Sequence, residues 1–172
     1  MNFSAWRGIK LAAVLLIAGI IQAAFADAVN LWGARPDLLL TTSLVGSMFC
    51  GEGAAALLGF SAAFVHASLA APPHAGVGSI LVSRTVVCFG LGWLEDRMYR
   101  DNVLVALVLT LGGTLAAECL FFVFYPQHNL LKWVRILLLT LAWNGVLSTP
   151  CYYAIRALLG RRREEQAAGA RE

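Results

Sequence analysis

Two charged side chains, Arg84 and Glu118, lie inside long apolar runs of this sequence. A charge near the centre of a bilayer costs at least about 2.5 kcal/mol on insertion scales, so each should face protein or water and have a partner. Arg84 lies seven residues after Val77 and Glu118 seven residues before Tyr125, the predicted outer ends of neighbouring runs. At about 1.5 Å per helical residue, both lie roughly 10 Å below one boundary. This common depth predicts a salt bridge; alternatively, one side chain reaches outward to water or meets another polar group.

Polar residues also mark the start of the second apolar run and the middle of the last. Arg35-Pro36-Asp37 opens the second run, where proline fits the first helical turn and Asp37 offsets the positive helix end. Asn144 needs an interhelical partner, and Pro150 frees a carbonyl one turn back and predicts a kink. A bent helix with a polar group above the bend suits a docking element and, equally, a packing detail.

The remaining reactive side chains form no pattern typical of catalysis. The cysteines and histidines are scattered, mostly at the ends of apolar runs, and match no metal-ligand spacing (Cys50, Cys88, Cys119, Cys151, His66, His74 and His128). Free cysteine packs as a small hydrophobic residue. No nucleophile with a base, phosphate-binding glycine loop or carboxylate pair is recognisable. We therefore predict a non-enzymatic protein with no catalytic, cofactor-binding or metal-binding residue.

The elements that position these residues follow from the segregation of charge. Apolar residues make up 59% of the chain and charged residues 13%, and the charges cluster in short breaks between runs long enough to cross a bilayer. Helices are expected, because backbone groups in lipid must bond within their own segment and the runs show no strand alternation. We predict six membrane helices, with the second and third joined as a tight hairpin at 50–53, over residues 9–29, 38–50, 53–71, 77–94, 103–125 and 134–159.

Lys and Arg predict the orientation by the positive-inside rule. With both termini cytoplasmic, three of the 13 basic residues fall in outer loops (Arg35, Lys132 and Arg135) and nine fall inside (Arg7, Lys10, Arg97, Arg100, Arg156, Arg161, Arg162, Arg163 and Arg171). One alternative stays open at the N-terminus. Arg7 and Lys10, the apolar stretch 11–22 and Ala24-Phe25-Ala26 also fit a cleaved secretory signal, which would leave five spans.

We predict one membrane domain over residues 1–160 and a charged cytoplasmic tail without fixed structure over 161–172. The basic cluster of the tail fits an anchor beside anionic lipid better than a nucleic-acid site. Small residues recur along the first and third spans, where they allow helices to approach closely. Internal packing is the simpler use of these residues, and a partner's membrane helix is the alternative.

Taken together, several segments resemble MreD, the integral membrane rod shape-determining family of bacteria, in order along nearly the whole chain. They begin with Arg35-Pro36-Asp37 and Gly59-Phe60, continue through Gly76-Val77, Asp101-Asn102 and Glu118, and end with the closest match, Trp143–Pro150, before a basic tail. The family commonly has Gly-Phe-x-x-Gly-x-x-x-Asp in the third span, where this chain has Ala63 and Ala67 in place of the second Gly and the Asp. Arg84 also falls where the family is usually apolar.

The resemblance implies an all-α bundle of six helices, similar to the substrate-binding subunits of energy-coupling-factor transporters, in the bacterial inner membrane. It implies a scaffold that binds MreC, a bitopic protein, and helps couple MreB filaments to peptidoglycan synthesis by RodA and a class B penicillin-binding transpeptidase. The competing interpretation is a vitamin-binding or small-solute-binding transporter subunit, whose outer cavity Trp32, His74, His128 and Trp133 could line. A proton-coupled carrier using Arg84 and Glu118 is a third. Whether the protein forms a homodimer stays open.

Overall fold

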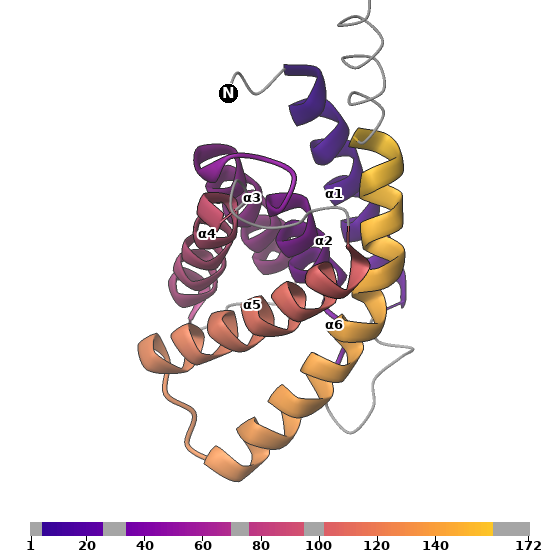
Figure 1. Cartoon of the computed structure of the whole chain (residues 1–172). Helices are drawn as coiled ribbons and strands as arrows, with labels where there is room; N and C mark the ends of the chain where they lie inside the picture. Colours follow the sequence, from indigo (N-terminus) through magenta and orange to yellow (C-terminus); the bar gives the residue numbers. More distant parts are fainter. Residues whose placement is uncertain (1–4, 26–33, 70–75, 95–101, 160–172) are drawn as a thin grey trace, which may run out of the picture.

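The computed structural model describes residues 5–25, 34–69, 76–94 and 102–159, and the secondary-structure elements within these ranges are helices. They are α1 (Ala5–Phe25), α2 (Leu38–Ser47), α3 (Glu52–Leu69), α4 (Val77–Leu94), α5 (Val103–Phe124) and α6 (Leu130–Leu159) (Figure 1). In the described part of the chain, four helices, α3 to α6, are long and apolar enough to cross a membrane. The protein is therefore an all-helical membrane protein. The tail at 161–172 and the predicted cleavage site at 24–26 lie wholly or partly outside the described residues.

The short helix α2 is the centre of the bundle. It packs against all five other helices, and every residue from Leu39 to Ser47 is buried. Three of its hydroxyl groups donate to carbonyls of the same segment, Thr41 to Asp37 at 2.9 Å, Ser43 to Leu40 at 2.8 Å and Ser47 to Ser43 at 2.7 Å. These bonds allow a helix rich in Ser and Thr to be buried without unpaired hydroxyl groups.

The length of α2 differs from the predicted span at 38–50. The helix has 10 residues and ends at Ser47, so it rises about 15 Å, roughly half of the hydrocarbon thickness. The expected tight connection to the next helix is confirmed, because α3 begins at Glu52 and packs against α2. Helix α2 thus extends from the interior of the bundle to one of its ends.

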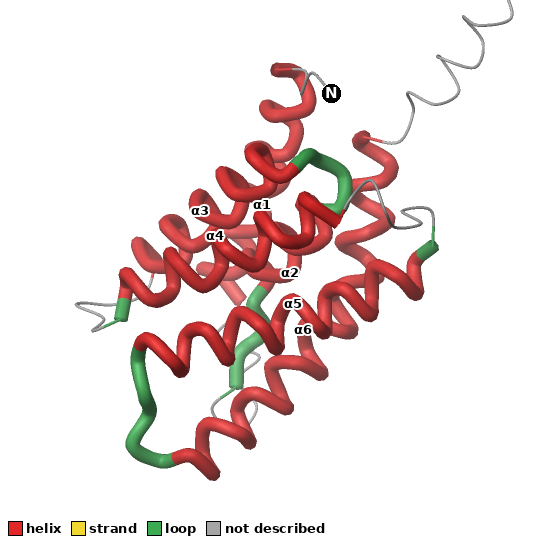
Figure 2. The backbone as a smooth tube through the Cα atoms, turned by 60° about the vertical axis from the view of Figure 1, so that its left-hand side comes forward, coloured by secondary structure: helices red, strands yellow, loops and turns green. Residues whose placement is uncertain are grey.

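Helices α3 and α4 pack with their backbones almost in contact, as their parallel course in Figure 2 illustrates. A Cβ atom built on Gly59 would lie 2.7 Å from Cβ of Cys88 and 2.8 Å from the carbonyl oxygen of Arg84. A Cβ atom on Gly92 would lie 2.5 Å from Cβ of Ala55. Glycine at these two places therefore fixes the separation of the two helices, as expected for small residues between membrane helices.

We expect Gly59→Ala to lower the free energy of unfolding by about 1–3 kcal/mol, because the added methyl group must displace a backbone carbonyl. Gly90→Ala is the matched control on α4, since its Cβ atom would meet nothing within 4 Å. There alanine should raise the stability of the helix by about 0.5–1 kcal/mol. Equilibrium unfolding of the purified protein in detergent, followed by helical circular dichroism, measures both. Equal effects of the two substitutions would contradict the close packing at Gly59.

The ends of α1 and α6 lie together. Lys10 Nζ donates to the carbonyl oxygen of Leu158 at 2.9 Å, which places a cation on the carbonyl end of α6. Figure 1 shows the start of α1 and the end of α6 at the same end of the bundle. Helices α5 and α6 form a hairpin, near whose loop Phe122 packs against Trp133 with ring centroids 4.6 Å apart. Helix α6 continues through Pro150, so the predicted kink does not break the helix and stays a prediction.

Candidate functional site

Asp37 begins α2 inside the bundle and is the centre of a buried polar cluster. Its Oδ1 caps the helix by accepting from the N–H of Leu40 at 2.9 Å, and its Oδ2 accepts from Arg84 Nη2 on α4. Asp37 and Arg84 are 7% and 6% exposed, so the ion pair is almost fully removed from solvent. The prediction that Asp37 offsets the start of this helix is confirmed, whereas Pro36 lies before the capping residue and not in the first turn.

The predicted salt bridge between Arg84 and Glu118 is wrong: the counter-ion of Arg84 is Asp37. Glu118 lines the same cavity as Arg84 and is half-buried. However, it forms no hydrogen bond or ion pair within the described ranges. The reason is the short α2. Since this helix starts in the interior, the segment before it carries Asp37 inward to Arg84, where a full-length span would have kept this carboxylate at the membrane face.

Asn144 holds the start of α2 to the neighbouring helices. Its Oδ1 accepts from the backbone N–H of Asp37 at 3.2 Å, and its Nδ2 donates to Thr114 Oγ1 on α5 at 3.2 Å. Asn144 is fully buried. The expectation of an interhelical partner for this residue is confirmed. Buried backbone outside a helix needs a partner from protein or water, and Asn144 supplies that bond at Asp37.

Gln22 and His66 complete the cluster from α1 and α3. Gln22 Oε1 accepts from the N–H of Leu39 at 2.9 Å, which fixes the orientation of the amide, and its Nε2 lies 3.2 Å from His66 Nδ1. The amide therefore donates to Nδ1, so the proton of a neutral imidazole lies on Nε2. His66 Nδ1 is also 3.7 Å from Asp37 Oδ2. The sequence did not single out Gln22 as part of a site, and it offered no recognisable partner for His66. The contacts of both residues depend on where α2 begins, which the sequence does not reveal.

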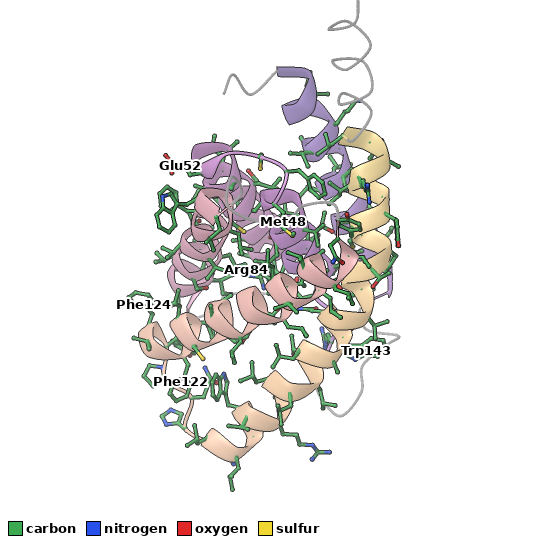
Figure 3. All side chains as sticks on the ribbon, in the orientation of Figure 1. Met48, Glu52, Arg84, Phe122, Phe124 and Trp143 are labelled. Carbon is green, nitrogen blue, oxygen red and sulfur yellow. The ribbon has the colours of Figure 1, made fainter. Side chains whose placement is uncertain are left out.

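These polar residues line a cavity of about 370 Å³. It lies between the end of α1, the start of α2, the end of α3, the start of α4, the C-terminal half of α5 and the N-terminal half of α6. Figure 3 shows Arg84 within the bundle. The described polar lining comprises Gln22, Arg35, Asp37, His66, Ser83, Arg84, Glu118 and Thr140. Of these, Arg84 has a buried amino group, Nη1, without a hydrogen-bond partner. The cavity thus brings charged and polar side chains from several helices together inside the bundle.

A second, apolar groove of about 810 Å³ runs along the outside of α1 and α3. Its lining combines small residues, including Gly8, Ala12, Gly19 and Ala54, with leucine and isoleucine side chains, of which Leu16, Ile20 and Leu57 are exposed. The groove and the cavity share two lining residues, Ala23 and Leu69. An occupant of the groove would therefore reach the mouth of the cavity at the end of α1.

The other predicted site residues are placed apart from the cavity. Gly59 contacts the backbone of Arg84 and so acts through helix spacing. Phe60 is 47% exposed and stacks on Phe64 with ring centroids 6.4 Å apart, and Pro150 is exposed on α6. In the described parts of the chain, no three His, Cys, Asp or Glu side chains could hold a metal ion together. His74, Trp32 and Asp101 lie outside the described residues.

Comparison of the chain with protein-family models, curated proteins and solved structures finds no match.

Proposed function

We propose that this protein is a membrane scaffold of the MreD type, which binds the single membrane helix of MreC and the segment that follows it outside the membrane. The observation that carries the proposal is the continuity of the groove on α1 and α3 with the polar cavity through Ala23 and Leu69. A bitopic partner presents the two matching parts in the same order, an apolar helix and then a polar near-membrane segment.

The physical chemistry of the groove supports a helix as its occupant. Lipid chains are as apolar as leucine, so helices associate in a membrane where small residues allow close packing. Gly8, Ala12 and Gly19 supply such a surface along α1, and Leu57 on α3 is 69% exposed beside it. The apolar groove is lined by residues from Gly8 to Ala24 along α1, and this elongated form suits a helix better than a compact solute.

The proposal includes an orientation in the bacterial inner membrane. The bundle crosses it with both termini cytoplasmic, α2 and the segment before it together accounting for one of six crossings. The excess of basic residues on the side of the termini supports this. The cavity then opens toward the outside, where peptidoglycan is made. The protein would link MreC to MreB filaments on the inner side and to RodA and a class B penicillin-binding transpeptidase in the wider complex.

Co-purification tests the proposal. The full-length protein is expressed with a tag beside the MreC of the same genome, and bound MreC is quantified after detergent extraction. Ala12→Phe fills the groove and should lower recovered MreC at least about tenfold, since tenfold corresponds to about 1.4 kcal/mol. Ala13→Phe is the control, because Ala13 is exposed on the same helix and does not line the groove. No co-purification with the unmodified protein, or equal effects of the two substitutions, would refute the proposal.

A second candidate function is a small-solute-binding subunit, and one observation favours it. The cavity volume of about 370 Å³ falls in the range of roughly 300–1,000 Å³ typical of small-ligand sites. Of the four residues expected to line such a cavity, His128 and Trp133 do not line this one, and Trp32 and His74 lie outside the described residues. A solute that stays bound through purification, seen by native mass spectrometry, would favour this function over the scaffold.

A further inference from the structure

Two residues that line the same cavity carry polar groups without partners in the described part of the chain, one a donor and one an acceptor. The donor is Arg84 Nη1, which is buried and makes no hydrogen bond. The acceptor is the carboxylate of Glu118, for which the described residues provide no hydrogen bond. Arg84 and Glu118 line the same cavity, yet the two form no ion pair within 4.0 Å. The gap between them leaves both groups unpaired within the described residues.

The protein cannot close this gap by moving Arg84. The guanidinium is bonded to Asp37, and Asp37 is itself fixed by its bond to the N–H of Leu40 and by the bond from its own N–H to Asn144. Swinging Arg84 to Glu118 would leave the Asp37 carboxylate buried without its counter-ion, which costs several kcal/mol. A bridging group must therefore accept from Arg84 and donate to Glu118.

The charges around the cavity limit what that group can be. Among the described lining residues, Arg35 and Arg84 balance Asp37 and Glu118 in formal charge. An anion would meet two carboxylates, and a cation would meet two guanidinium groups. An amide carries an acceptor oxygen and a donor N–H and has no net charge. It fits both unpaired groups at once.

We propose that this cavity is an amide-binding site, in which a carbonyl oxygen accepts from Arg84 Nη1 and the attached N–H donates to Glu118. The amide comes from the near-membrane segment of the partner, so this assignment rests on the proposed scaffold function. A hydrogen bond donated to the ionised carboxylate of Glu118 is charge-assisted and is therefore stronger than one between neutral groups.

The first test uses a synthetic peptide with the sequence that follows the MreC membrane helix, added to the full-length protein in lipid nanodiscs. Fluorescence anisotropy of the labelled peptide gives the Kd. Glu118→Ala should weaken binding about tenfold, the effect of losing one charge-assisted hydrogen bond. Glu118→Gln should weaken it less, because the side chain keeps an acceptor oxygen. Glu52→Ala is the matched control: this carboxylate is exposed at the start of α3, away from the cavity (Figure 3).

The second test identifies the amide. Peptides in which one amide at a time is replaced by an ester lack a single N–H. One ester should weaken binding about tenfold to the unmodified protein and cause no further loss in Glu118→Ala, because that variant already lacks the acceptor. Unfolding curves establish that Glu118→Ala is folded.

The outcomes separate the two proposals. If the peptide binds and neither Glu118→Ala nor any ester changes its Kd, the amide site is refuted and the scaffold stands. If MreC does not co-purify and the peptide does not bind, the scaffold itself fails. If native mass spectrometry shows that the purified protein retains a small amide that Glu118→Ala loses, the amide comes from a free solute, and the assignment to the partner is overturned.

Discussion

Asp37→Asn is expected to lower the free energy of unfolding by about 3–5 kcal/mol, because it removes the counter-ion of a buried guanidinium. Asparagine has nearly the same shape as aspartate, and its Oδ1 can still cap α2 by accepting from the N–H of Leu40. The loss therefore reports the charge of Asp37 and not its cap. Arg84→Met in the same chain removes the unpaired cation, so the double variant should recover a large part of the lost stability.

Glu118→Gln is the control for this experiment. It removes a carboxylate from the same cavity, yet Glu118 makes no ion pair with the described residues. Its free energy of unfolding should stay within about 0.5 kcal/mol of the unmodified protein, as for substitutions away from packed or paired groups. Equilibrium unfolding in detergent, followed by circular dichroism, measures all four proteins. A loss at Glu118 equal to that at Asp37 would show that Arg84 divides its charge between the two carboxylates.

Asn144→Ala should lower the free energy of unfolding by about 2–4 kcal/mol, since it leaves two buried groups without partners at roughly 1–3 kcal/mol each. These groups are the backbone N–H of Asp37 and the hydroxyl of Thr114. Asn144 is fully buried, so water cannot readily take its place. Differential scanning fluorimetry and chemical unfolding should agree on this loss.

Ser148→Ala is the matched control on the same helix. Ser148 is 1% exposed, and its hydroxyl donates to the carbonyl oxygen of Gly145 one turn before it. This bond is local to α6, and alanine favours the helix, so the change should cost less than about 1 kcal/mol. A cost at Ser148 as large as at Asn144 would mean that buried polarity in general, and not the link to Asp37, stabilises this part of α6.

The positions of the helices could be predicted from the sequence, because apolar run length and charge segregation are local properties. The runs at 77–94 and 103–125 match α4 and α5 to within one residue. The need of Asn144 for a partner was also predictable, since an amide in an apolar run must be satisfied. Its particular partners, Thr114 and the N–H of Asp37, were not.

The pairing of Arg84 could not be deduced from depth alone. Depth counted along each helix is comparable between helices only if every span reaches both faces of the membrane. Helix α2 violates this assumption, and the sequence held a signal of it: the run at 38–50 is too short for a span of roughly 20 residues. The roles of Gln22 and His66 depend on where α2 begins, which is a property of the assembled bundle.

The residues that pair with the start of α2 come much later in the sequence, and this affects how the protein is inserted into the membrane. A ten-residue helix with an aspartate at its start is a poor substrate for insertion on its own. The residues that neutralise and fix Asp37 emerge from the ribosome 47 and 107 positions later. Helix α2 therefore gains these two polar partners only after α4 and α6 have been synthesised. The core of this bundle is completed last, although its central helix is synthesised second.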